Sequence, residues 1–144
     1  MMLRKKSGQK GIAAVEFGLV LPIVVLILFG IFEFGMAFWR KQVLTAAVRE
    51  GARAGIVATS PKKTKDEIED KVKTYLDNAG YTDSGRTVTA TGAGGASGAS
   101  LTVTATYPTS LVILSRLKLG DGVDSQVDGS GMMQLSATVT MQME

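Results

Sequence analysis

The longest apolar run of the chain lies near its N-terminus and follows a short basic tail. Residues 12–39 are almost entirely apolar, and residues 1–11 before them include four basic side chains. The uncharged centre, residues 17–32, is 16 residues long between Glu16 and Glu33. As a helix this centre would span ~24 Å, which is less than the ~30 Å hydrocarbon core of a bilayer. With the flanking apolar residues the run is long enough, so we predict a membrane-spanning helix with a carboxylate near each end.

The helical pattern continues beyond the apolar run. Val43, Ala47 and Val48 recur at helical spacing, and the next proline is Pro61. We therefore predict one helix over about residues 12–58, ~70 Å long, with an apolar first half and an amphipathic second half. Such a rod is too long for a small globular core.

A second, shorter helix is predicted over about residues 64–79. Thr64 and Glu67 have the spacing of a capping box, and Gly80 is a typical residue after a helix end. The mixed charges of residues 65–73 are interpreted as a solvated helix face. The predicted apolar face consists of Ile68, Val72, Leu76 and Ala79.

After Gly80 the apolar period changes from that of a helix to that of a strand. Residues 101–107 and 135–143 alternate between apolar and hydroxyl or amide side chains, which predicts two half-buried strands. Residues 86–91 are predicted as a third, weaker strand. Residues 92–100, which are Gly, Ala and Ser, connect this strand to the strand at residues 101–107. These elements predict a small antiparallel sheet.

The segment between the later strands is less regular. Residues 111–119 are strongly apolar and fit either a short helix or a fourth strand, and residues 120–131 are rich in Gly, Asp and Ser. Asp121, Asp124 and Asp128 lack the spacing and final Glu of a calcium loop, so we interpret them as part of an acidic loop. The fold class is thus α+β, with a long N-terminal membrane-spanning helix, a short helix and a small antiparallel sheet.

Charge and composition narrow the function. The net charge is +3, but without the four basic residues of the tail 12 basic residues face 13 acidic ones. The basic balance therefore belongs to the tail and gives no reason to expect nucleic-acid binding. The chain has no Cys and no His, which removes disulfides, thiolate metal sites and His-dependent catalysis. Ser115 and Lys118 are too weak a pattern for a catalytic dyad, so we expect neither an enzyme nor a cofactor or metal.

Three classes of function fit these features. They are a subunit of a membrane-anchored filament, a single-pass anchor that displays a small binding module, and a secreted domain or unrecognised hydrolase. A secretory signal peptide shares the basic start, but this apolar core is slightly too long and Gly35-Met36-Ala37 is a poor cleavage site. A charge at the bilayer centre costs ~2.5–3.5 kcal/mol on insertion scales, so Glu16 calls for a functional explanation. Only the filament class explains both Gly11 and Glu16.

Small residues along the predicted helix add a second feature. Ala14 and Gly18 are four residues apart, a spacing that lets helices approach closely, although an Ala- and Gly-rich helix also produces it by chance. Ala47, Gly51 and Gly55 repeat the spacing. Pro22 cannot donate a hydrogen bond to the Gly18 carbonyl and is predicted to kink or loosen the helix.

The N-terminal sequence resembles that of a known family. Residues 8–17 (GQKGIAAVEF), 19–22 (LVLP), 31–35 (IFEFG) and 46–55 (AAVREGARAG) closely resemble the TadE-like pseudopilins of the tight-adherence (Tad/Flp) pilus system. The C-terminal residues 137–144 are a looser match. The resemblance implies a pilin-like fold and a precursor that a prepilin peptidase cuts after Gly11.

The resemblance also implies a division of the chain and a set of assembly residues. Residues 1–11 become a basic prepilin-type leader, residues 12–59 a long helix with its transmembrane part at about 12–39, and residues 60–144 an extracytoplasmic α+β domain. Cleavage would make Ile12 the N-terminus and Glu16 the fifth residue of the mature chain. The residues expected to support subunit assembly are Ala14, Glu16, Phe17, Gly18 and Pro22.

The implied function is a minor pilin or pseudopilin that aids assembly of a thin adhesive pilus. Its expected partners are the prepilin peptidase, other pilins of the system, an inner-membrane assembly platform and the bilayer, with the N-terminus in the cytoplasm. In a helix bundle, the Glu16 carboxylate could pair with the free α-amine at Ile12 of a neighbouring subunit, which exists only after cleavage. A position at the headgroup level without a partner is the alternative for Glu16 and for Glu33. The related TadF and TadG branches and a type II secretion pseudopilin also remain open.

Overall fold

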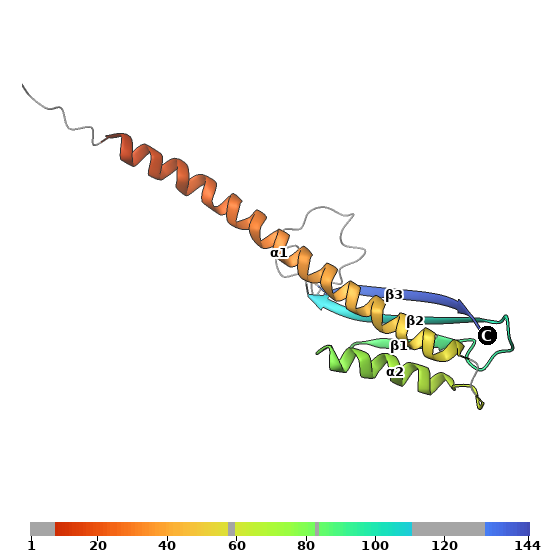
Figure 1. Cartoon of the computed structure of the whole chain (residues 1–144). Coiled ribbons are helices and arrows are strands. Elements are labelled where there is room, and N and C mark those ends of the chain that lie inside the picture. The colour runs from red at the N-terminus through yellow and green to blue at the C-terminus, as the bar shows by residue number, and fades with distance from the viewer. Residues whose placement is uncertain (1–7, 58–59, 83, 111–131) are drawn as a thin grey trace, which may run out of the picture.

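The computed structural model describes residues 8–57, 60–82, 84–110 and 132–144. The element order is α1 (Gly8–Ile56), α2 (Lys65–Asn78), β1 (Thr87–Thr91), β2 (Ser100–Ser110) and β3 (Met132–Gln142). Figure 1 shows α1 as a rod whose C-terminal half lies along the sheet while its N-terminal half projects away from the domain. The α+β class is confirmed, with a long apolar helix, a short second helix and a three-stranded antiparallel sheet.

Helix α1 is 49 residues long, which corresponds to ~73 Å. It begins at Gly8, before the predicted start, and ends at Ile56, before the proline that we expected to end it. The helix is unbroken at Pro22, which lies inside it. The missing N–H of Pro22 therefore removes one hydrogen bond without interrupting the helix.

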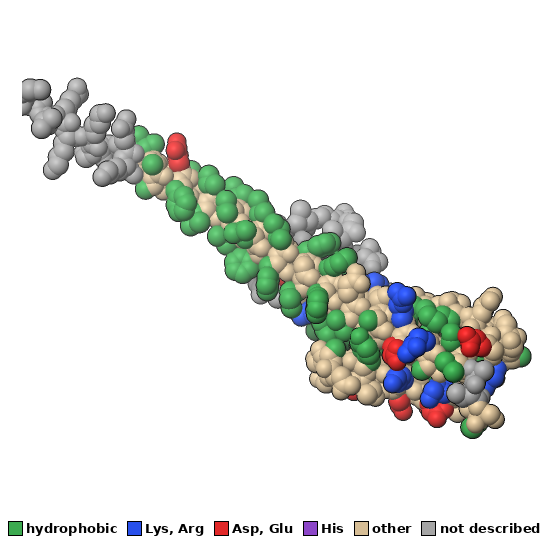
Figure 2. All heavy atoms as spheres, in the orientation of Figure 1, with side chains coloured by type: hydrophobic (Ala, Val, Ile, Leu, Met, Phe, Trp, Pro, Cys, Tyr) green, Lys and Arg blue, Asp and Glu red, His purple; other side chains and the backbone are tan. Residues whose placement is uncertain are grey.

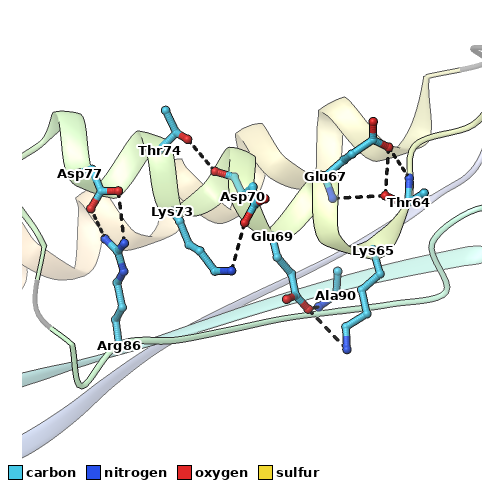
Figure 3. A network of polar contacts seen from close by, with 10 residues as sticks. All are labelled: Thr64, Lys65, Glu67, Glu69, Asp70, Lys73, Thr74, Asp77, Arg86 and Ala90. Carbon is cyan, nitrogen blue, oxygen red and sulfur yellow. Dashed lines mark hydrogen bonds and ion pairs between the residues drawn. The ribbon is translucent and has the colours of Figure 1, made fainter.

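Helix α2 begins at the predicted capping box. The Glu67 N–H donates to Thr64 Oγ1 at 3.3 Å, and the Thr64 N–H donates to Glu67 Oε2 at 2.7 Å (Figure 3). The side chains of Ile68, Val72 and Leu76 are buried, as predicted. The placement of Ala79 on this face is wrong, because the helix ends at Asn78 and the exposed Ala79 is its C-cap.

The three strands form one antiparallel sheet in the order β1-β2-β3. Strands β2 and β3 are each 11 residues long; β2 extends beyond the predicted range at both ends, whereas β3 begins three residues before its predicted start and ends one residue before its predicted end. Val103 in the central strand is paired with Ala90 on one side and Val139 on the other. The predictions for residues 111–119 and 120–131, including Asp121, Asp124, Asp128, Ser115 and Lys118, lie outside the described residues.

The two faces of the sheet differ because apolar and hydroxyl residues alternate along each strand. The inward side chains of β2, Leu101, Val103 and Ala105, are fully buried. On the outer face, hydroxyl groups of β2 and β3 pair across the strands, with Thr102 Oγ1 and Thr104 Oγ1 each 3.0 Å from a threonine hydroxyl of β3.

The core lies between the C-terminal half of α1, helix α2 and the inner face of the sheet. Its largest fully buried side chains include Leu44 and Val48 of α1, Ile68 and Leu76 of α2, and Leu101. Polar contacts also tie α2 to the sheet, since the Ala90 N–H of β1 donates to Glu69 Oε1 at 3.0 Å (Figure 3). The domain thus holds the second half of α1 in place and leaves the first half unsupported.

Candidate assembly surface on the N-terminal helix

The projecting half of α1 is apolar on every side. On the face seen in Figure 2, hydrophobic side chains cover most of the rod where it projects from the domain. Ile12, Phe17 and Ile31 are each about two-thirds exposed, at 64%, 65% and 66%. Within Gly11–Ile56 the helix contains a stretch that is long and apolar enough to cross a membrane, and none of that stretch is buried by the protein. A helix that is hydrophobic all round and not in a core requires a bilayer or other proteins around it.

The predicted site residues all lie on this half. Gly11, Ala14, Gly18 and Pro22 follow one another at spacings of three or four, so helix geometry places them on one side of α1. All four are exposed, and a Cβ atom added at Gly11 or Gly18 would meet nothing within 4 Å. The domain therefore leaves this stripe of small residues open.

Glu16 and Phe17 lie on other sides of the helix from that stripe. Both are exposed. Glu16 forms no hydrogen bond or salt bridge with any residue that the structure describes. It lies one helical turn after Ile12, because side chains four residues apart are neighbours on a helix. Within the described part of the chain, Glu16 therefore has no charge partner.

The second set of small residues has a different role. A Cβ atom at Gly51 would collide with Val72 Cγ2, and one at Gly55 would lie 2.6 Å from both Ile68 Cδ1 and Leu101 Cδ2. Gly51 and Gly55 thus let α1 approach α2 and the sheet within the same chain. Both this set and the Ala14–Gly18 pair have the same four-residue spacing in the sequence. Only the fold shows that Gly51 and Gly55 are packed within the chain while Ala14 and Gly18 are exposed.

The junction between the two halves of α1 has a site that the sequence did not predict. The end of β2 meets α1 there and leaves a pocket of about 380 Å³. Thr109 is 1% exposed, and its hydroxyl has no hydrogen-bond partner among the described residues. Arg40, which also lines the pocket, is half-buried and has no hydrogen bond or salt bridge to the described part of the chain. Thr109 follows the ordinary alternation of a strand, so no sequence signal marks it.

Among the described residues, the carboxyls with shifted pKa values, Glu67 and Asp77, belong to the domain. The backbone N–H and the hydroxyl of Thr64 donate to Glu67 and lower the pKa of its carboxyl below the ordinary value of 4.5. Hydrogen bonds and the positive charge of Arg86 lower the pKa of Asp77 in the same way (Figure 3). In the described ranges, no cluster of three or more His, Cys, Asp or Glu side chains could hold a metal ion.

Comparison with known proteins identifies the N-terminal segment. The family model of TadE-like protein matches residues 11–53, which form most of α1. No curated protein and no solved structure matches the chain significantly. The matched segment begins at Gly11 and contains both the exposed apolar half of α1 and the part that packs in the domain. The similarity to the TadE-like family therefore covers this segment of the chain.

Proposed function

We propose that this chain is a non-enzymatic minor pilin or pseudopilin that aids assembly of a Tad-type pilus. The projecting half of α1 anchors it in the bacterial inner membrane and contacts the helices of other subunits. The observation that carries the proposal is a single helix with one half packed in a folded domain and the other half apolar and exposed on every side. The family match over residues 11–53 supports it independently.

The anchor is proposed to stay attached to the domain. Helix α1 runs without a break from the apolar half into the core, and Ala37, at the weak signal-peptide site, is itself only 6% exposed. Cleavage after Ala37 would cut the helix within its packed region. The unbroken helix therefore favours a permanent anchor over a removable signal peptide. We place the N-terminus in the cytoplasm and the domain outside, where it can meet other pilus subunits.

Processing is proposed to occur after Gly11. Gly11 is exposed, and apart from the adjoining helix backbone nothing lies within 4 Å of the place where its Cβ atom would be, so a prepilin peptidase could reach it. Cleavage removes the basic leader and creates an α-amine at Ile12. The inner-membrane assembly platform and the other pilins of the system then become the partners of the mature chain.

Glu16 is proposed to pair with the Ile12 α-amine of a neighbouring subunit. Because Glu16 has no partner among the described residues of its own chain, its carboxylate is available to another molecule. A charge-assisted hydrogen bond in a low-dielectric bundle would fix the register between helices, much as a buried polar residue does in a coiled coil. The competing arrangement is a bond between Glu16 and the α-amine of the same chain, one turn away.

The intact mass of the protein isolated from membranes tests the processing step. We expect a chain that begins at Ile12. Gly11→Leu should insert in the membrane but remain uncut, because the larger side chain hinders the peptidase. The matched control Gly18→Leu adds the same side chain further along the same side of the helix and should be cut normally. A mature chain beginning after Ala37 would instead identify a signal peptide and remove the pilin assignment.

Crosslinking between subunits, together with a count of surface pili, tests the role of Glu16. Glu16→Gln and Glu16→Ala should leave cleavage and insertion intact and reduce both co-assembly and pilus number. Loss of one partner from a fully buried ion pair costs ~3–5 kcal/mol, and less where water reaches the pair. If crosslinking and pilus number are unchanged, Glu16 has no pairing role, and the protein is better explained as a membrane-anchored binding module.

A further inference from the structure

We propose that the pocket between the end of β2 and the middle of α1 binds one phospholipid of the surrounding membrane, with the phosphate held by Arg40 and Thr109. This inference rests on the proposed membrane anchor and adds a specific ligand to it. The pocket has a volume of about 380 Å³. Its lining includes Phe29, Phe32, Met36 and Arg40 of α1 and Thr109 and Ser110 of β2.

Two unsatisfied polar groups mark the pocket as a binding site. Thr109 is almost completely buried, yet its hydroxyl has no hydrogen-bond partner among the described residues. An unpaired buried hydroxyl is destabilising, and such groups in native proteins usually have a partner. Thr109 is two positions along β2 from Tyr107 and four from Ala105. Because side chains alternate between the two faces of a strand, Thr109 lies on the inner face, toward α1, with the other inward residues of β2. A phosphate oxygen in the pocket would accept its hydrogen bond.

Arg40 supplies the positive charge. Its side chain is half-buried, and no described residue pairs with its guanidinium. A guanidinium is the side chain best suited to bind a phosphate, because it can donate two parallel hydrogen bonds. Since Arg40 and Thr109 line the same pocket, one phosphodiester could satisfy both groups.

The apolar lining of the pocket and its position relative to the proposed membrane surface fit the acyl chain of a phospholipid. Phe29 and Phe32 are exposed, and Met36 lies between them and Arg40 along α1. If the hydrocarbon core begins at Ile12, a helix reaches its ~30 Å limit near Phe32. Arg40 then lies at headgroup depth beside Trp39, a residue type that is enriched at this interface. The acyl chain would run from Arg40 toward Phe29.

Native mass spectrometry of the full-length protein in detergent tests the site. The wild type should retain one phospholipid after delipidation, whereas Thr109→Val and Arg40→Gln should each reduce the retained fraction roughly tenfold. The matched controls are Thr104→Val, on the outer face of the same strand, and Arg53→Gln, on the exposed side of the same helix. Both should retain lipid as the wild type does. Equal retention in Thr109→Val and the wild type would overturn the proposal, and water would then be the partner of the hydroxyl.

A further readout separates the pocket from the anchor. Resistance to alkaline extraction from membranes should be the same in every variant, and its absence in the wild type would contradict the anchor itself. An anchored protein that retains no phospholipid would contradict only the pocket.

Discussion

The two halves of α1 are built from similar residues but have opposite surroundings. In the C-terminal half, Leu44 and Val48 are buried against α2 and the sheet, whereas large side chains of the N-terminal half, such as Phe17, are exposed. The two halves differ on the side of the helix that faces away from the apolar residues just named. The C-terminal half has charged residues there, including Arg49 and Arg53, whereas residues 17–32 of the N-terminal half have none. Amphipathicity therefore assigns one half to the domain, whereas the other half has the apolar surface that the proposed membrane anchor requires.

The small residues of the two halves also differ in their surroundings. Gly51 and Gly55 have neighbours within 3 Å of a Cβ position, while Gly18 has none within 4 Å. A close approach between helices needs small residues, but the residues do not specify which helix approaches. In this protein the C-terminal set is used within the chain, and the N-terminal set is free to be used between chains.

Truncation of a core side chain should produce the largest difference between the halves. Ile68→Ala removes a fully buried side chain that packs beside α1 and should lower the unfolding free energy of the domain by ~2–5 kcal/mol. Leu26→Ala, in the exposed half, should leave it unchanged, because that side chain does not contribute to the domain core. Thermal or denaturant unfolding of full-length protein in detergent measures both. A similar loss in the two variants would show that the halves are not independent.

Addition of a side chain at a glycine should give the next largest difference. Gly51→Val places methyl groups against Val72 and should destabilise the domain by ~1–3 kcal/mol through overpacking. Gly18→Val should not affect domain stability, since the space around Gly18 is open. The same substitution should instead reduce crosslinking between subunits in membranes. Destabilisation of the domain by Gly18→Val, or unchanged stability in Gly51→Val, would contradict the assignment of Gly51 to the packed half of α1 and of Gly18 to the open half.

Much of this architecture could be predicted from the sequence. The apolar run of residues 12–39 and the helical period that follows it predicted the long helix, and Thr64 with Glu67 predicted the start of α2, because capping is local chemistry. The end of α2 was less certain because Ala79 continues the apolar spacing, and only the backbone shows that it is the cap. The pocket could not be predicted, since Thr109 and Arg40 come together from two elements that are distant in sequence.

The capping box should give a smaller effect, confined to the domain. Thr64→Ala should cost about 1 kcal/mol of stability through loss of the N-cap. It should also weaken part of the pH dependence: the backbone N–H of residue 64, the larger cause of the lowered pKa of Glu67, remains, whereas the hydroxyl that donates the second hydrogen bond is lost. A lowered folded pKa gives stability that is present above the ordinary value of 4.5 and is lost as the pH falls through the folded value.

Unfolding measured at neutral pH and at successively lower pH tests this prediction. The stability difference between the wild type and Thr64→Ala should shrink as Glu67 becomes protonated. The control Glu67→Gln retains a hydrogen-bond acceptor but no charge, so its own contribution should not change with pH. A difference that grows in acid would contradict the proposed role of the carboxylate.

Cysteine accessibility along α1 tests the division of the helix most directly. The chain has no native cysteine, so single substitutions can be labelled with a membrane-impermeant maleimide without background. In intact membranes, Ile23→Cys and Ile27→Cys should be protected and Gln42→Cys and Arg49→Cys should react, with all four reacting after detergent unfolding. Equal labelling at positions 23, 27 and 42 in intact membranes would show that the apolar half of α1 is not covered by lipid or by other helices, and would contradict the account.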